Sequence, residues 1–138
     1  MGKLDIDSIS ALLRKHGISP TSQRIKIASL MLSCVEHLSA DQIMLSVNRR
    51  KAEASKATIY NTLKLFVKKG LVREVIIDPA RILYDPNTAH HHHFYDVVTG
   101  ELRDIDASEV SVLNLPNMPE DRILDGIDII IRTRPAAI

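Results

Sequence analysis

The stretch Ser-Lys-Ala-Thr-Ile-Tyr-Asn-Thr-Leu at residues 55–63 decides the fold of the first half of this 138-residue chain. Ser55 is a good helix N-cap and Gly70 is a good helix stop, so the pattern predicts a helix that runs to about Lys69. Apolar side chains recur at helical spacing and form the expected buried stripe: Ile59, Leu63, Phe66 and Val67. Lysines and polar side chains are left for the other faces of this helix.

Shorter helical patterns come before this stretch, and a hairpin pattern follows it. The expected elements are helices over residues 5–16, from the Thr21 N-cap and from the Ser39 N-cap, then strands over residues 71–77 and 81–84. The turn between these strands is Asp78-Pro79-Ala80. Helices followed by a two-stranded wing describe a winged helix-turn-helix, which places its recognition helix, here residues 55–69, in the major groove of DNA.

The second half of the chain has the pattern of a small α/β unit. The expected elements are strands over residues 94–98, 101–105 and 127–132, with Thr99-Gly100 as a hairpin turn, and a short helix over residues 107–114. A unit this small buries little of its own sheet, so we expect oligomerisation to complete it. The predicted fold class is therefore α+β, and the predicted divisions are a DNA-binding domain at 1–84, a hinge at 85–89 and a dimerisation domain at 90–138.

Charge changes sign where the two halves meet. Residues 1–84 carry 14 basic and 7 acidic side chains, a net charge of +7, whereas residues 85–138 carry 4 basic and 10 acidic ones, a net charge of −6. A basic half suits a polyanionic partner, and an acidic half suits cations or self-association. Solvent-exposed surfaces also often carry an uneven distribution of charge without any binding role.

Several classes of protein are disfavoured by composition. The chain has no secretory signal pattern at its start and no apolar run near the ~18 residues that span a bilayer, so we expect no membrane partner. The lone cysteine, Cys34, excludes an intrachain disulfide and a cysteine-based zinc finger, and we expect it to be a small buried apolar side chain. These features fit a cytoplasmic protein.

The start of the predicted recognition helix carries side chains that suit DNA. Thr58 can bond phosphates or base edges, Tyr60 offers a flat face to a thymine methyl group, and Asn61 can bond adenine. Lys56 adds a positive charge for phosphates. Alone, an ordinary amphipathic helix with a solvated lysine face would explain the same residues, but two preceding helices and a following wing favour DNA binding.

Four successive histidines, His90 to His93, are the second notable feature. An engineered affinity tag would explain the run without any function, but tags normally lie at a terminus, whereas this run is internal and lies between two predicted strands. In an extended strand His91 and His93 share one face, and His90 and His92 share the other. Such a pair, with nearby carboxylates, suits zinc, iron or manganese, and a histidine pair can also ligate haem iron.

In combination, these pieces resemble the ferric uptake regulator family over nearly the whole chain. The matching motifs are Thr21-Ser22-Gln23-Arg24, His37-Leu38-Ser39-Ala40-Asp41, Ala57-Thr58-Ile59-Tyr60-Asn61-Thr62-Leu63, Gly70-Leu71-Val72 and the histidine run. The resemblance implies a homodimer, or a higher oligomer, with an N-terminal winged helix and a C-terminal α/β dimerisation domain. It also implies binding to a palindromic DNA operator when a metal or other cofactor permits, and it adds Arg24 to the expected DNA contacts.

Site residues follow from the same resemblance. The family's regulatory metal site falls on His37, Asp85, His91, His93 and Asp104, a set from both halves that would fix their relative angle. A second metal or haem site would use His90, His92 and Glu109, but its remaining histidine is missing because Gly126-Ile127-Asp128 stands there. The paired cysteine motifs of the family's structural zinc site are absent, so no such zinc is expected.

The histidine run and the lost cysteines look most like the iron response regulator branch of the family, which senses iron through haem. We therefore expect a repressor of iron or haem homeostasis that uses a divalent metal (iron, manganese or zinc), with release from DNA by haem as the alternative. A metalloenzyme using His91, His93 and a carboxylate is a distant alternative. A metal-buffering or protein-interaction module is another.

Overall fold

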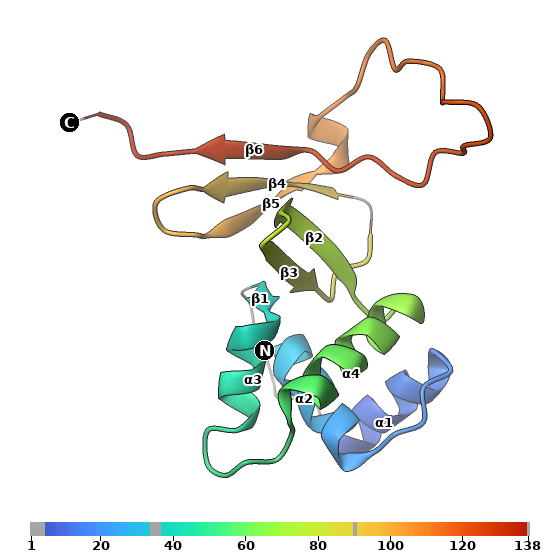
Figure 1. The fold of residues 1–138 in the computed structure, drawn as a ribbon, viewed down its shortest axis with the longest axis vertical. Helices are drawn as coiled ribbons and strands as arrows, with labels where there is room; N and C mark the ends of the chain where they lie inside the picture. Colours follow the sequence, from blue (N-terminus) through green and yellow to red (C-terminus); the bar gives the residue numbers. More distant parts are fainter. Residues whose placement is uncertain (1–4, 34–36, 90, 138) are drawn as a thin grey trace. The chain divides into compact units, whose positions relative to one another are not determined.

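The computed structural model describes residues 5–33, 37–89 and 91–137. The chain folds as two compact units, residues 1–88 and residues 89–138, and each is considered by itself. The first unit holds four helices and one small sheet, and the second holds the other sheet (Figure 1). The α+β class predicted from the sequence is confirmed.

Short polar caps begin the helices of the first unit. The helices are α1 (Ile6–Lys15), α2 (Ser22–Ser33), α3 (Ala40–Val47) and α4 (Lys56–Lys68). Thr21 accepts the Arg24 N–H, and Ser39 forms a capping box with Gln42 ahead of α3. Ser55 accepts the Thr58 N–H and thereby begins α4. The caps predicted at Thr21, Ser39 and Ser55 are therefore confirmed, because each satisfies an N–H group that has no partner within the helix.

The sheet of the first unit has one strand more than the sequence predicts. It contains β1 (Leu38–Ser39), β2 (Arg73–Asp78) and β3 (Arg81–Asp85) in the order β1-β3-β2, and both pairings are antiparallel. The two-stranded wing is thus the β2–β3 hairpin with β1 added along β3. A strand of two residues has no periodicity of its own, so only its pairing with β3 reveals it.

The helices and the sheet of the first unit share one apolar core. Its most deeply buried side chains come from all four helices: Ile9, Leu13, Ile27, Ile43, Ile59, Leu63 and Phe66. Gly70 follows α4 with φ of 77°, a conformation that favours glycine, and lets the chain turn towards β2. This core fixes the start of α4 relative to the other helices.

A three-stranded mixed sheet forms the second unit. It contains β4 (His91–Asp96), β5 (Leu102–Asp106) and β6 (Ile130–Thr133) in the order β5-β4-β6, with β4 antiparallel to β5 and parallel to β6. The sequence suggested that the histidine run lies between two strands, and this prediction is wrong. His91 to His93 begin β4 itself, while His90 is outside the described residues.

The helix predicted over residues 107–114 is wrong for most of its length. Only η1 (Ala107–Glu109), a single 3₁₀ turn capped by Asp106, forms there. Asn114 has a positive φ of 60° and Pro116 follows, so this part of the chain cannot continue as a helix. Residues 111–128 have no regular structure and are mostly exposed. No helix among the described residues is long and apolar enough to cross a membrane.

Candidate metal centre and nucleic-acid interface

In the first unit, strand pairing brings His37 and Asp85 together although 48 residues separate them. Leu38 pairs with Tyr84 between β1 and β3, so the residues just outside this pair, His37 and Asp85, lie opposite each other. His37 Nε2 is 2.9 Å from Asp85 Oδ2, and the other carboxylate oxygen accepts the N–H of Asn87 at 2.9 Å. Both side chains are largely buried.

The second unit gathers His91, His93 and Asp104 on one face of its sheet. His93 pairs with Asp104 across β4 and β5, and His91 projects to the same side because it is two residues away. Asp104 Oδ1 lies 3.3 Å from His93 Nε2 and 3.5 Å from His91 Nε2. The two imidazole rings are 4.5 Å apart in an edge-on arrangement.

A backbone carbonyl orients the first of these rings. His91 Nδ1 lies 2.5 Å from the carbonyl oxygen of Ala89, an arrangement in which Nδ1 carries the proton and donates. The lone pair of the ring is then on Nε2, on the side of Asp104. Metal-binding histidines commonly use this arrangement, in which one nitrogen donates to an oxygen and the other binds the ion.

The donor chemistry of both groups fits a divalent transition metal. In each unit the candidate ligand atoms lie within 4.8 Å of one another, close enough to meet around one ion. Each group combines imidazole nitrogen with carboxylate oxygen, and this set suits zinc, iron or manganese better than calcium or magnesium.

His92 is turned to the other face of β4 and has a different role. Its Nδ1 accepts the N–H of Ile129 at 3.1 Å, and its side chain is buried. Glu109, at the end of η1, is exposed. Among the described residues, neither belongs to a cluster of three or more ligand side chains. The predicted second site thus stays a prediction, and its first residue, His90, lies outside the described residues, as does Cys34, which we expected to be a small buried side chain.

The predicted DNA contacts lie at the start of α4. Lys56, Tyr60 and Asn61 are exposed, whereas Thr58 is half-buried and accepts a hydrogen bond from the Ser55 hydroxyl. Lys56 Nζ is 5.8 Å from the centre of the Tyr60 ring. Arg24, on α2, donates to the carbonyl oxygen of Ser19 at 2.9 Å. The exposed side chains can reach base edges, whereas Arg24 is already partly engaged.

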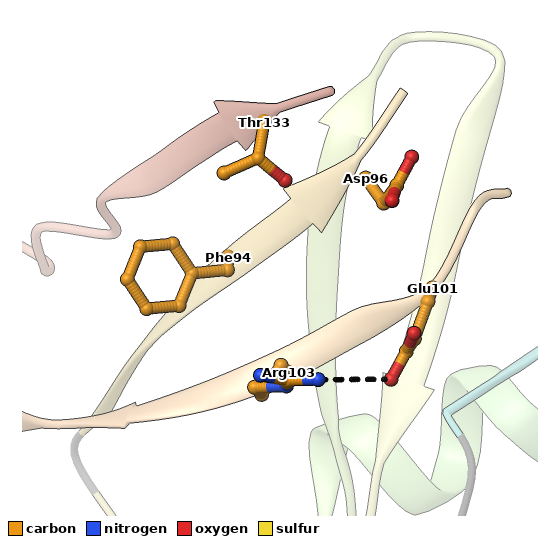
Figure 2. Close-up of a pocket in the computed structure, with 5 residues that line it drawn as sticks. All are labelled: Phe94, Asp96, Glu101, Arg103 and Thr133. Atoms are coloured by element: carbon orange, nitrogen blue, oxygen red, sulfur yellow. Dashed lines mark ion pairs between the residues drawn. The ribbon is translucent and has the colours of Figure 1, made fainter. Parts of the chain in front are cut away.

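A small hollow on the sheet of the second unit was not predicted from the sequence. It has a volume of about 280 Å³, and Figure 2 shows the side chains around it: Phe94, Asp96, Glu101, Arg103 and Thr133. Arg103 lies 3.8 Å from Glu101. The N–H groups of Thr99 and Val98 bond to the Asp96 carboxylate and lower its pKa. The two carboxylates of the hollow therefore already have partners: Asp96 binds the N–H groups of the neighbouring turn, and Glu101 lies beside Arg103.

Comparison with known proteins relates this chain to one family of regulators. A model described as "Ferric uptake regulator family" matches residues 15–120. The chain is 32% identical over 100 residues to a peroxide-responsive repressor, PerR, of Staphylococcus epidermidis, a match that covers 72% of this chain and 67% of that protein.

Solved structures agree with this match. A ferric uptake regulator from Pseudomonas aeruginosa, determined with manganese, is similar with a TM-score of 0.69 and 22% identity, covering 93% of this chain and 98% of that one. PerR from Streptococcus pyogenes has a TM-score of 0.52 and 32% identity, covering 73% and 70%.

Proposed function

The chain belongs to the ferric uptake regulator family, whose members are transcriptional regulators and not enzymes, and we propose that it is a repressor whose signal metal is held by His37, Asp85, His91, His93 and Asp104. Family membership removes the reason for the metalloenzyme alternative. The observation that supports the proposal most is that strand register builds two imidazole–carboxylate groups, one in each unit.

In the proposed mechanism one ion is shared by the two groups. His37 and Asp85 would supply ligands from the first unit, and His91, His93 and Asp104 would supply them from the second. The ion would stabilise one relative angle of the two units, because it binds more tightly when all the ligands can reach it. The ion would act as a cross-link between nitrogen and carboxylate ligands.

DNA binding is proposed for the first unit. Residues 1–84 would form the winged-helix domain, 85–89 the hinge and 90–138 the dimerisation domain of a homodimer. Lys56, Thr58, Tyr60 and Asn61 would meet a palindromic operator in the major groove, with Arg24 on the backbone. A dimer reads two half-sites, so the angle that the ion stabilises would decide whether both recognition helices fit. Such a regulator would work in the cytoplasm.

The proposed signal is iron, bound as a divalent ion by His37, Asp85, His91, His93 and Asp104. Haem is the alternative ligand of the histidine run, but the burial of His91, His92 and His93 favours a small ion there, because a flat macrocycle needs an open face. Peroxide is a second candidate signal, since the chain is similar to peroxide-responsive repressors over 72% of its length.

In vitro selection from a random duplex library, followed by gel-shift assays on the untagged protein, tests the proposal. We expect a palindromic sequence whose affinity changes at least tenfold between the metal-free and the manganese-, iron- or zinc-loaded protein. The same assay after addition of haem or hydrogen peroxide separates the three signals. The absence of a selected sequence in every state would overturn the proposed function.

A further inference from the structure

Three consecutive cations, Arg49, Arg50 and Lys51, stand in the loop between α3 and α4 and are not explained by the site described above. All three are exposed. Within the part of the chain that the structure describes, none of them forms a salt bridge. Free surface cations of this density raise self-repulsion, so a group of them directly before a recognition helix calls for a partner.

Hydrogen bonds hold this loop in one shape. Asn48, the C-cap of α3, accepts the N–H groups of Glu53 and Ala54 on one side-chain oxygen at 2.7 and 2.9 Å. Its side-chain nitrogen donates to the carbonyl oxygen of Ala54 at 2.9 Å, and Gln23 of α2 donates to the carbonyl oxygen of Glu53 at 2.7 Å. The three cations therefore lie on a loop that hydrogen bonds hold in one conformation. Such a loop loses little conformational entropy when it binds a partner.

The acidic residue of the loop, Glu53, offsets little of this charge, because its main partner is Lys26 and its attraction to Lys51 is a smaller contribution. Glu53 pairs with Lys26 of α2, and the hydrogen bond from Lys26 lowers the pKa of the Glu53 carboxyl. Beside this pair is a polar hollow of about 550 Å³, lined by Thr21, Ser22, Gln23, Lys51, Ala52 and Glu53. Hydroxyl and amide groups along its wall are donors of the kind that contact phosphate oxygens.

The loop is also tied closely to the start of α4. The N-cap Ser55 is four positions after Lys51, and four extended residues reach at most about 14 Å. The major groove is about 12 Å wide, so a helix whose first turn enters it brings this loop to the phosphates along the groove edge.

We infer that Arg49, Arg50 and Lys51 form a second phosphate-binding surface, which contacts the DNA backbone beside the groove that α4 occupies. This inference rests on the proposed DNA-binding function. The surface adds affinity without sequence preference, because phosphates are the same at every base pair. A duplex, rather than an acidic protein, is the expected partner because the surface is continuous with the start of α4.

The test compares the full-length variant Arg49→Gln/Arg50→Gln with wild type by fluorescence anisotropy on the selected operator and on a random duplex. Each lost phosphate contact lowers the salt slope of log affinity by about 0.9, so two contacts lower it by about 1.8. Between about 50 and 200 mM salt, wild type should then lose roughly tenfold more affinity than the variant, on both duplexes.

The matched control is Arg14→Gln/Lys15→Gln at the end of α1, which lies on the opposite side of the first unit from this loop (Figure 1). Arg49→Lys/Arg50→Lys should restore the wild-type slope. Equal slopes for wild type and the glutamine variant, in a wild type that binds the operator, would overturn the inference alone. A wild type that binds no duplex would overturn the proposed function instead.

Discussion

His92 Nδ1 accepts the N–H of Ile129 at 3.1 Å, so one histidine of the run holds the chain ahead of β6. Its neighbours, His91 and His93, turn to Asp104 on the other face of β4. The alternation of the strand thus divides one short run of identical residues between a structural contact and the proposed ligand role.

This division predicts different results for two neighbouring alanine variants. His92→Ala leaves the Ile129 N–H without its partner and should lower the free energy of unfolding by about 1–3 kcal/mol, with metal affinity nearly unchanged. His91→Ala should instead weaken manganese binding by at least about 10-fold, since even residues that only orient metal ligands contribute that much. Urea denaturation and metal titration on both variants check the pair. Equal losses of metal affinity would contradict the division.

Removing one charge from the first unit tests its contribution to the metal site. Asp85→Asn keeps the shape of the side chain and an oxygen for the Asn87 N–H, but it removes the negative charge beside His37. We expect manganese affinity to fall by at least about tenfold. Isothermal titration calorimetry measures it, with Glu74→Gln on the adjacent strand β2 as the control. If both variants bind manganese as wild type does, Asp85 is not a ligand.

Asn61 is the sharpest test of base recognition. Asn61→Ala should weaken binding to the selected operator by about 1–3 kcal/mol, which is roughly 5- to 150-fold, because one base contact is lost. Its salt slope should equal that of wild type, since no phosphate loses a cation. Anisotropy titrations at several salt concentrations measure both quantities, and Asn117→Ala in the second unit is the control. A loss that is equal on operator and random duplex would show that Asn61 does not read bases.

Short-range signals made most of the first unit predictable from the sequence. Ser39 and Ser55 cap their helices through atoms three residues away, so the pattern is complete within one turn. The contact of His37 with Asp85 is different, because it depends on β1, a strand too short for periodicity to reveal. Family resemblance suggested both residues, while the strand pairing supplies the physical reason that they meet.

The second unit was harder to predict because its contacts join distant residues. The bond from Ile129 to His92 spans 37 positions, and no local pattern indicates it. The helix expected over residues 107–114 ends after the single turn of η1, because Val110 already has an extended backbone, with φ of −130° and ψ of 132°. Irregular chain beyond η1 leaves apolar side chains such as Leu113 and Ile123 exposed, which the expected oligomerisation would cover.

Acid should destabilise the hairpin of the second unit through Asp96. The N–H groups of Thr99 and Val98 bond to its carboxylate and hold its pKa below the ordinary value of 3.8. A depressed pKa in the folded state means that the stabilisation is present above about pH 4 and is lost as the pH falls through the lower folded value. Asp96→Asn removes the titrating group but keeps an acceptor oxygen. The melting temperature of this variant should therefore fall less than that of wild type between about pH 5 and pH 3. Differential scanning calorimetry checks this, with the exposed Asp125→Asn as the control, and parallel pH profiles for Asp96→Asn and wild type would exclude the carboxylate as the cause.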